Sequence, residues 1–398
     1  MTLRPYALLL LAATAACSSP SANASDTAAT SAAPFVVTKQ AQFDKPFAMA
    51  FLPDGSLLVT EKAGKLKLRD PSGHIRDVAG VPQVRQIGQG GLLDVVLAPD
   101  FAKSHAIYLT YSEARPRGAA LAMARATLVG TQLQNPQVLW RQGSDGKGGQ
   151  FGAVIAFAPD GKSLFLSSGE RQRFTPAQDI NQKLGKILHL TLDGKPAPGN
   201  PFAGKTGTPT VTVFDPPANS GAAFAEKGTQ QPVDGTNTAP AEIWSMGHRN
   251  PYGLAFDADG RLWEIEMGPQ GGDEVNVILP GKNYGWPKAS NGSNYDDTDI
   301  PDHKPGDGFE PPKVFWNPSI SPGGLMIYSG NLFPQWKGSA FIAALSGEAL
   351  IRVKLSGDTA AKADQWPMNT RIRDVVQGPD GAIWLLQDDG GLVKLTPR

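Results

Sequence analysis

Few of the residues able to do chemistry in this chain stand in a recognisable spacing. Among the five histidines, His248 comes nearest to standing in a motif, SMGHRNPYG, and we expect it to be a structural hydrogen bonder that orients the loop of Arg249. Four acidic residues further on offer the hard oxygen ligands that calcium prefers: Asp296, Asp297, Asp299 and Glu310. A solvated acidic loop without metal is the alternative.

The charge balance excludes several classes of partner. Lys and Arg together number 37, as do Asp and Glu, so the formal net charge is zero and there is no electrostatic footprint for nucleic acid or an acidic membrane surface. With 40% hydrophobic residues, 17 Phe and 8 Trp, the chain has ample material for a large core, which excludes disorder for most of its length.

The N-terminus has the features of an export signal. Arg4 precedes an apolar run over residues 7–16, which is far shorter than the roughly 20 residues needed to span a bilayer. Small residues directly before Cys17 resemble the lipobox of bacterial lipoproteins, in which the cysteine is lipidated. Thr14 stands where leucine is usual, so an ordinary signal peptide is the alternative. Cys17 is the only cysteine, and no disulfide or zinc–cysteine cluster can stabilise the folded part.

A tether is expected to follow this leader, which covers residues 1–17. Residues 18–34 are rich in Ser, Ala and Thr, a composition that suits a flexible linker, so the folded domain is expected over residues 35–398. Lipidation at Cys17 would place the domain at the periplasmic face of a bacterial membrane, held only by its lipid anchor. Ser18 after the cysteine favours the outer membrane, by analogy with known lipoproteins.

A hairpin pattern recurs along the folded part. Each copy has alternating apolar residues, a tight turn that is mostly of the Pro-Asp-Gly type, and a second β-rich run, because Asp-Gly supplies the backbone conformations that a hairpin needs. The copies begin at Phe47, Leu92, Ala153, Tyr252, Gly324 and Ile372. No long stretch has helical periodicity. The repeats therefore predict an all-β fold, a six-bladed β-propeller of four-stranded antiparallel blades, with a pair of β-sandwiches as the alternative.

The spacing of the repeats is uneven. The turns at Asp160 and Asp259 are so far apart that an insertion must lie between them, and the run rich in Pro, Gly and Thr over residues 194–240 is the candidate. We expect this insertion to be a surface excursion near the mouth of the ring.

Several segments together resemble one known family. They are GQGGLLDVVLAPDF, SMGHRNPYGLAFDADGRLWEIEMGPQGGDEVNVILPGKNYGWP, WNPSISPGGLMIYSG and TRIRDVVQGPDG. This combination is similar to the soluble quinoprotein sugar dehydrogenases, the glucose/sorbosone dehydrogenase family, over most of the chain from Phe47 onward. The resemblance implies a six-bladed propeller with pyrroloquinoline quinone (PQQ) and calcium on its axis. It also implies oxidation of an aldose at C1 to its lactone.

The resemblance implies which residues grip the cofactor. PQQ carries three carboxylates, and the planar fork of arginine can hold a carboxylate through paired hydrogen bonds. Arg249, Arg371 and Arg373 match family positions that hold the cofactor, with Asn250 beside them. For Arg371 and Arg373, pairing with nearby acids at strand ends is the alternative.

Metal and substrate contacts follow from the same resemblance. The carbonyls of Gly268 and Pro269 would coordinate the calcium, although Gly-Pro is also an ordinary turn sequence. Gln89 matches a family position near the sugar, and Glu170 stands where the family has an acidic residue close to the substrate. Amide and carboxylate groups suit sugar hydroxyls because they offer donors and acceptors; capping a blade loop is the alternative role.

The chain departs from the family at the catalytic base. The family has a histidine that takes the proton from the C1 hydroxyl, and the matching position here is Gln150, whose amide cannot accept a proton at physiological pH. Val154 stands where the family often has arginine, and Ser346 where glucose-oxidising relatives have a cofactor-contacting lysine. Asp273, in the GGDE segment, is a substitute base if burial raises its pKa.

Two functions from different classes are therefore compatible with the sequence. The first is an oxidoreductase that oxidises a sugar and passes the electrons to an acceptor that the sequence does not identify. The second is a non-catalytic lipoprotein propeller that binds a sugar, a quinone or a partner protein, which the loss of the histidine favours. A calcium-dependent lactonase is a third, although the GHRN and GPQGGDE segments fit it poorly. Because fold similarity does not transfer activity, the site must decide.

Overall fold

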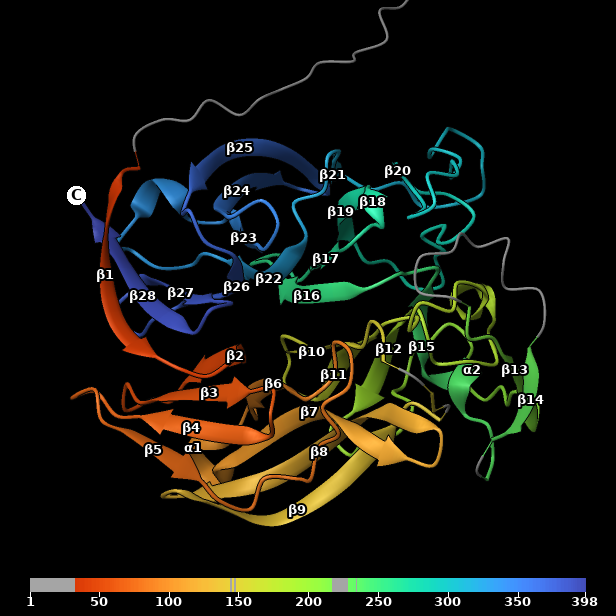
Figure 1. Ribbon diagram of the computed structural model, residues 1–398, viewed down its shortest axis with the longest axis horizontal. Helices are drawn as coiled ribbons and strands as arrows, with labels where there is room; N and C mark the ends of the chain where they lie inside the picture. The colour runs from red at the N-terminus through yellow and green to blue at the C-terminus, as the bar shows by residue number, and fades with distance from the viewer. Residues whose placement is uncertain (1–32, 144, 147, 217–227, 234) are drawn as a thin grey trace, which may run out of the picture.

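The computed structural model describes residues 33–143, 145–146, 148–216, 228–233 and 235–398. Over these residues, six four-stranded antiparallel sheets stand in a ring, as Figure 1 shows. The predicted all-β, six-bladed β-propeller is confirmed, and the pair of β-sandwiches was the wrong alternative. The leader and Cys17 lie outside the described residues, and the tether does so up to residue 32.

Each blade consists of four strands, and the first strand named for each blade is the one nearest the ring axis. Blade 1 is β2 (Pro46–Phe51), β3 (Leu57–Glu61), β4 (Lys65–Arg69) and β5 (Ile75–Val78); blade 2 is β6 (Leu92–Leu97), β7 (Ala106–Arg115), β8 (Gly118–Val129) and β9 (Gln132–Arg141). Blade 3 is β10 (Gly152–Phe157), β11 (Ser163–Ser168), β12 (Lys186–Thr191) and β15 (Ile243–Met246); blade 4 is β16 (Pro251–Phe256), β17 (Leu262–Glu266), β19 (Asp273–Val277) and β21 (Val314–Trp316). Blade 5 is β22 (Pro322–Ile327), β23 (Ala340–Ala344), β24 (Ala349–Ser356) and β25 (Thr359–Pro367); blade 6 is β26 (Ile372–Gln377), β27 (Ile383–Gln387), β28 (Gly391–Pro397) and β1 (Phe35–Gln42).

The sequence repeats correspond to the two innermost strands of each blade. The copy that begins at Phe47 forms β2 and β3, and the copy that begins at Tyr252 forms β16 and β17. The six innermost strands enclose a cavity of about 240 Å³ on the ring axis. Its lining includes two aromatic residues, Phe47 and Tyr252, and two aspartates, Asp94 and Asp374.

The N-terminal strand closes the ring. β1 is the outermost strand of blade 6 and pairs with β28, from Phe35 opposite Pro397 to Gln42 opposite Gly391. A carboxylate also joins the last blade to the first, because Asp374 Oδ2 accepts a hydrogen bond of 3.0 Å from the backbone N–H of Met49. The chain ends are therefore held by both a strand ladder and a side chain.

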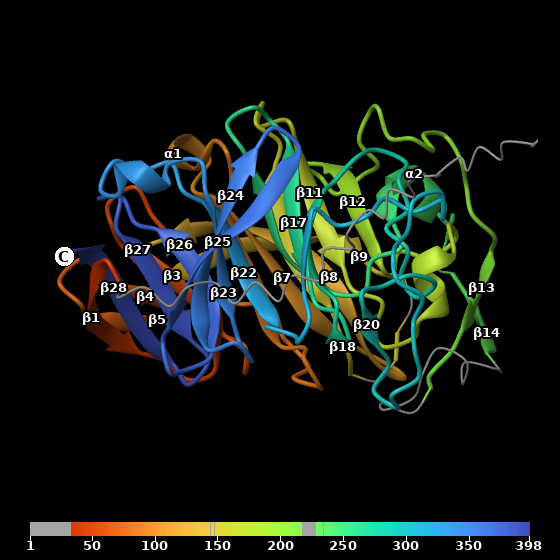
Figure 2. The same ribbon diagram turned by 90° about the horizontal axis from the view of Figure 1, so that it is seen from above.

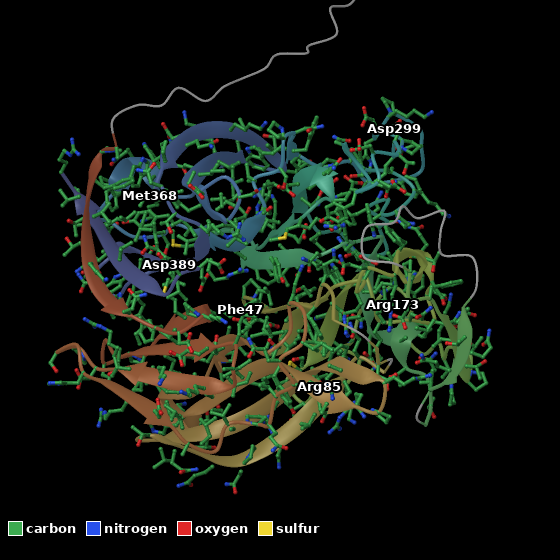
Figure 3. The ribbon with its side chains drawn as sticks, in the orientation of Figure 1. Phe47, Arg85, Arg173, Asp299, Met368 and Asp389 are labelled. Atoms are coloured by element: carbon green, nitrogen blue, oxygen red, sulfur yellow. The ribbon has the colours of Figure 1, made fainter. Side chains whose placement is uncertain are left out.

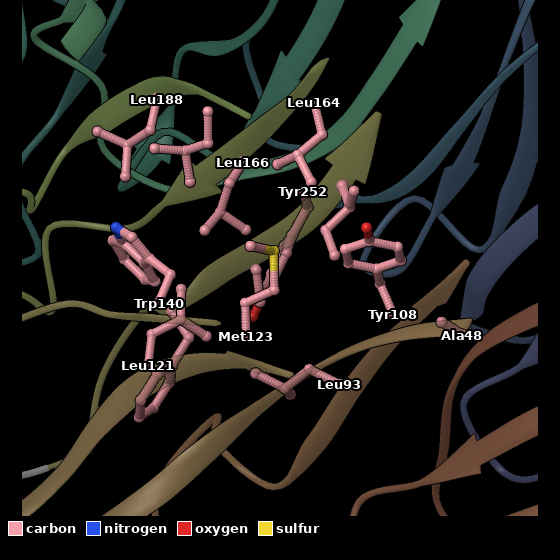
Figure 4. Close-up of a cluster of buried hydrophobic side chains, with 14 of the residues drawn as sticks. Ala48, Leu93, Tyr108, Leu121, Met123, Trp140, Leu164, Leu166, Leu188 and Tyr252 are labelled. Atoms are coloured by element: carbon pink, nitrogen blue, oxygen red, sulfur yellow. The ribbon is translucent and has the colours of Figure 1, made fainter. Parts of the chain in front are cut away.

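The core lies mainly between neighbouring blades. Figure 4 shows Leu121, Met123 and Trp140 of blade 2 facing Leu164, Leu166 and Leu188 of blade 3, and all six side chains are buried. Alternate strand residues point into this interface, as the period-2 pattern of the sequence requires. Replacing one of these leucines by alanine would cost about 2–5 kcal/mol of folding free energy. This packing fixes the blades, and with them the loops at each end of the ring.

Short elements outside the blades lie along the periphery. The described part of the run at residues 194–240 contains a hairpin of β13 (Thr210–Val213) and β14 (Thr229–Pro232), followed by α2 (Ala239–Glu242); Figures 1 and 2 show both at the outer edge of the ring. The remaining short elements are α1 (Phe101–Ser104), η1 (Thr175–Gln178), η3 (Pro334–Trp336) and the two-stranded sheet of β18 (Gln270–Gly271) and β20 (Gly292–Ser293). Within the described ranges, every helix is too short or too polar to cross a membrane.

Candidate cofactor and substrate site

The blade topology brings the candidate residues to one end of the ring. In each blade, the residue just before the innermost strand accepts, through its carbonyl, the backbone N–H of a residue near or just after the end of the second strand. These hydrogen bonds run from Lys62 to Lys45, Ser112 to Gly91, Gly169 to Phe151, Met267 to Asn250, Leu345 to Ser321 and Asp388 to Arg371. We call the end where the innermost strands begin the entry end of the ring.

Arg249 lies at the entry end of blade 4 and is buried, with 4% of its surface exposed. Its guanidinium lies over the rings of Trp286 and Tyr295, at 5.3 and 5.6 Å from their centroids, and donates a 3.1 Å hydrogen bond to the Tyr295 hydroxyl. It also donates to the carbonyl oxygens of Met267 (2.9 Å) and Gly268 (2.6 Å). Its Nε is buried and has no hydrogen-bond partner among the described residues. An oriented cation with one unused donor is therefore held at this position.

Arg371 and Arg373 lie at the entry end of blade 6 and share one carboxylate. Arg371 Nε lies 2.9 Å from Asp388 Oδ2, and the Arg373 guanidinium lies 2.6 Å from Asp388 Oδ1. Although burial opposes it, the charges of Arg373 and Arg371 hold the pKa of Asp388 below its usual range. The expected alternative, pairing with a nearby acid at a strand end, therefore holds in this structure. Asp388 was not singled out from the sequence, because an acid in a DDGG turn carries no distinctive signal.

Tyr252 connects the arginines of blades 4 and 6. Burial raises the pKa of its hydroxyl, while the charges of Arg373 and Arg249 both act to lower it, so both arginines lie within electrostatic range of one phenol on the ring axis. The Arg373 guanidinium lies 5.7 Å above the Phe47 ring, which packs edge-on against Tyr252, and Figure 3 shows Phe47 near the middle of the ring. The Tyr252 hydroxyl donates a 2.7 Å hydrogen bond to Gln89 Oε1.

Four of the sequence-derived residues thus meet around Tyr252. Gln89 does so through its hydrogen bond to the Tyr252 hydroxyl, and Arg373, Asn250 and Arg249 do so through their effect on the pKa of that hydroxyl, which all three act to lower. Tyr252 itself was missed as a site residue. Its repeat position made it a candidate only for packing.

Glu170 lies in the buried turn between β11 and η1, and Gln150, which stands just before β10, contacts the same turn. Both Glu170 oxygens are occupied by backbone N–H groups, those of Gln172, Arg173 and Phe174. Gln150 is almost fully buried, and its Oε1 accepts a 2.8 Å hydrogen bond from the Gln172 N–H. Glu170 therefore acts first as a brace for this turn, which is the alternative role expected for it, and the Gln150 amide helps to hold the same backbone.

Asp273 is a structural brace for the predicted calcium loop. Its carboxylate accepts four hydrogen bonds of 2.6 to 2.9 Å, from the N–H groups of Gly268, Ile320 and Ser321 and from the Ser319 hydroxyl. Burial raises its pKa, as the sequence argument required for a base, but these donors oppose the shift and use both oxygens. The expectation that Asp273 serves as a substitute base is therefore not supported by its contacts.

The Gly268 position needs a glycine. A Cβ atom there would lie 2.1 Å from the carbonyl oxygen of Gly271, which no side chain can tolerate. The neighbouring Pro269 lines a small cavity together with Arg249, Glu170 and Tyr295. The two carbonyl-bearing residues expected to hold calcium thus lie beside the arginine expected to hold the cofactor.

A buried acidic cluster behind Arg249 was missed in the sequence. Glu266 accepts hydrogen bonds from His248 Nδ1 (3.0 Å) and from the Arg249 backbone N–H (2.6 Å), so His248 does orient the Arg249 loop. Burial and the nearby Glu266 charge raise the pKa values of Glu264 and Glu274 well above their usual range. The only signal in the sequence is the acidic alternation in LWEIE and DEVNV, where inward-facing apolar residues would be expected.

The acidic loop after β20 does not gather its carboxylates. Glu310 is paired with Lys313 (3.1 Å) and Lys282 (3.6 Å), and Asp296 accepts hydrogen bonds from Thr298 in its own turn. Asp299 lies at the outer edge of the molecule in Figure 3. Among the described residues, the group of three or more possible metal ligands is instead His248, Glu264 and Glu266. The solvated loop, the alternative expectation, fits this arrangement.

Comparisons with known proteins place the chain in a family. The model of the glucose/sorbosone dehydrogenase family matches residues 43–214 and 223–394. The chain belongs to the glucose/sorbosone dehydrogenase family. An aldose sugar dehydrogenase of Escherichia coli (strain K12) is 37% identical over 374 residues, covering 90% of this chain and 92% of the relative. The quinoprotein glucose dehydrogenase B of Acinetobacter calcoaceticus is 25% identical over 440 residues, covering 88% of this chain and 84% of that protein.

Solved structures support the same placement. The apo form of the soluble aldose sugar dehydrogenase from Escherichia coli matches with a TM-score of 0.78 and 36% identity, over 92% of this chain and all of the other. A PQQ-bound aldose sugar dehydrogenase from Streptomyces coelicolor matches with a TM-score of 0.69 and 28% identity, over 93% of this chain and all of the other. This glucose/sorbosone dehydrogenase homologue therefore has the family's ring, with glutamine at position 150.

Proposed function

We propose that the chain is a PQQ-dependent oxidoreductase that oxidises an aldose or a related sugar at C1 to the lactone. One observation carries the proposal beyond family membership: cations from separate blades reach the entry end, with Arg249 buried just before β16 and Arg373 over the Phe47 ring that packs against Tyr252, and both charges act to lower the pKa of the Tyr252 hydroxyl. Such a pair suits a flat ligand that carries several carboxylates. The match to a PQQ-bound aldose sugar dehydrogenase supports the same cofactor.

The donors at the entry end fit this cofactor. The Arg249 Nε is buried and unpartnered among the described residues, as expected for a donor that serves a ligand. Arg371, Arg373 and Asn250 add three more polar groups, and the Gly268 carbonyl, which now accepts from Arg249, is a hard oxygen of the kind that calcium prefers. When bound, the quinone would accept the hydride from the sugar C1.

The chain's own residues would position the sugar and receive its proton. The Gln89 amide, held by the Tyr252 hydroxyl, offers an N–H donor and a carbonyl acceptor to sugar hydroxyls. Gln150 cannot take the C1 hydroxyl proton, because an amide is not a base at neutral pH. Asp273 Oδ2 already accepts hydrogen bonds from three donors of the protein itself. We therefore propose that this proton leaves to solvent, and that turnover is slower than a histidine would allow.

A second candidate function rests on that same glutamine. The buried Gln150 amide braces the turn at Gln172, so the position has a structural role without chemistry. A non-catalytic lipoprotein propeller that binds a sugar, a quinone or a partner through its entry end would need no base at this position.

Reconstitution separates the two candidates. The purified chain, incubated with calcium and PQQ, is assayed for dye reduction over a panel of aldoses, and PQQ binding is measured in parallel by fluorescence titration. The oxidoreductase predicts tight PQQ binding with turnover of at least one aldose. Tight PQQ binding without turnover would establish the binding propeller, and absence of PQQ binding would reject the cofactor assignment.

We also propose that the protein is exported and anchored through a lipid on Cys17, at the periplasmic face of the outer membrane. The support is the sequence of residues 1–34 alone. Metabolic labelling with a fatty acid tests it, since Cys17→Ser should abolish labelling and release the protein from the membrane fraction. Labelling that persists in this variant would contradict the anchor.

A further inference from the structure

Blade 1 contributes a cation to the entry end that neither the resemblance nor the family comparison assigns. Lys62 is the first residue after β3, and its backbone N–H donates a 3.0 Å hydrogen bond to the carbonyl of Lys45, the residue before β2. Asp388 has the same place in the adjacent blade 6, where its N–H donates to the carbonyl of Arg371. Lys62 and Asp388 are therefore topological equivalents in neighbouring blades.

Electrostatic interactions also link these groups. Burial and then the charge of Arg373 lower the pKa of the Lys62 ammonium, while Asp388 acts in the opposite direction. Among the described residues, the ammonium makes no hydrogen bond or ion pair. Asp388 already pairs with Arg371 and Arg373, and the charge of Lys45 lowers the pKa of Lys62 further, so cations outnumber the carboxylate of Asp388 here. This uncompensated charge is costly without a ligand, and an anion would relieve it.

Lys62 also lies against the segment that carries Gln89. The Lys62 carbonyl oxygen accepts a 3.2 Å hydrogen bond from the Leu92 N–H. The same oxygen lies so close to Gly91 that a Cβ atom on Gly91 would be only 2.2 Å away from it. The Lys62 backbone is therefore fixed against the segment that carries Gln89.

The expected lysine of blade 5 is missing on the other side of blade 6. Ser346 replaces it, and its hydroxyl only hydrogen-bonds to Ser319 and Ser321. Compared with the glucose-oxidising relatives, the entry end therefore has one positive charge fewer in blade 5.

We propose that Lys62 binds a carboxylate of the anionic cofactor and restores the positive charge that Ser346 does not supply. This inference rests on the proposed PQQ site. Lys62 and Ser346 belong to different blades, so Lys62 does not take the place of the missing lysine. The proposal is that it restores the total positive charge at the entry end. Within the described part of the chain Lys62 has no partner to lose, so its side chain can turn to the ligand without breaking a contact.

Equilibrium titration of the full chain with PQQ, followed by quenching of tryptophan fluorescence, tests the proposal. Lys62→Met should weaken PQQ binding about ten- to hundredfold, the loss expected for one charge-assisted hydrogen bond. Lys62→Arg should retain most of the affinity. Lys65→Met is the matched control, because it removes a charge from an exposed position in the same hairpin, and it should bind PQQ like the wild type.

Thermal unfolding without ligand gives a second readout. Because Lys62 is a cation held beside another cation, Arg373, Lys62→Met should unfold at the same temperature as the wild type or higher, whereas a merely structural lysine would lower it. PQQ binding within twofold of wild type in Lys62→Met, or a lowered unfolding temperature, would overturn the role of Lys62. If the wild type itself does not bind PQQ, the proposed function falls, and this inference falls with it.

Discussion

The Arg249 guanidinium donates a hydrogen bond of 2.6 Å to the carbonyl oxygen of Gly268, so the arginine expected to hold the cofactor and a carbonyl expected to hold calcium are in direct contact. Glu266 accepts the backbone N–H of Arg249, and Asp273 accepts the N–H of Gly268, so buried carboxylates fix both ends of this contact. The backbone of Arg249 and of Gly268 is thus already fixed, and binding of calcium and a carboxylate ligand would need only the Arg249 side chain to adjust.

Arg249→Ala should lower the affinity for PQQ at least a hundredfold, because a buried guanidinium able to hold a carboxylate is removed from the axis of the ring. Fluorescence titration with PQQ measures the effect. Arg261→Ala is the control, since Arg261 lies in the same blade at the opposite end of β16 and β17 and pairs with Asp257 and Asp259 of its own turn. Unchanged PQQ affinity in Arg249→Ala would remove this residue from the site.

Gln150→His should raise the rate of sugar oxidation about a hundredfold or more, the size of general-base assistance. The rate in this variant should also rise with pH through the range near 6.5 in which imidazole loses its proton, and the wild type should lack that step. Steady-state dye reduction from pH 5 to 9 measures both effects. Gln150→Asn controls for loss of the hydrogen bond to Gln172, because it introduces no base. A PQQ-loaded Gln150→His variant with the wild-type rate and pH profile would show that this position does not limit the chemistry.

Asp273→Asn should destabilise the fold by about 2–4 kcal/mol, because an amide cannot accept all four hydrogen bonds and leaves buried donors unpaired. The shape of the pH–rate profile should stay the same if the carboxylate is a brace. Urea unfolding and a pH–rate profile measure the two effects. Loss of activity at constant stability, with a changed profile, would instead restore Asp273 as the base.

The fold was predictable because its signal repeats. Each inner hairpin has its own turn and its own alternation of apolar residues, and the copy that begins at Tyr252 forms β16 and β17 as expected. The insertion at residues 194–240 was visible only as a gap between repeats and as a run rich in Pro, Gly and Thr. The structure adds the β13–β14 hairpin, whose strands are too short to be recognised from composition.

The site was harder to predict, because contacts between blades decide what a side chain does. Glu170 and Asp273 have the residue type that chemistry needs, yet buried backbone N–H groups occupy their carboxylates. Lys62 and Asp388, by contrast, stand in ordinary turn sequences, and only their equivalent places in neighbouring blades bring them together. A single sequence gives residue types and their order along the chain, and it does not give the spatial relation between one blade and the next.

Two carboxyl groups on the ring axis should make the stability depend on pH. Asp94 and Asp374 line the axial cavity, and each accepts a backbone N–H of the following blade, Ile155 for Asp94 and Met49 for Asp374. Burial, reinforced by the charge of Asp374, raises the pKa of Asp94 to about 7, and burial raises that of Asp374 to about 6. Between about pH 4 and pH 7, the unfolded chain has lost the Asp94 proton while the folded chain retains it.

The free energy of unfolding should therefore fall as the pH rises through this window, by up to about 1.4 kcal/mol per pH unit from Asp94. Asp94 also accepts the backbone N–H of Val95. Asp94→Asn should be less stable at pH 4, because the amide cannot accept from both Val95 and Ile155, but it should lose less stability between pH 4 and pH 7 than the wild type. Urea unfolding at half-unit pH intervals measures both slopes, with Asp54→Asn in an exposed hairpin turn as the control. Equal slopes in the wild type and Asp94→Asn would mean that Asp94 is already ionised in the folded ring at pH 4, and that the two hydrogen bonds it accepts outweigh its burial.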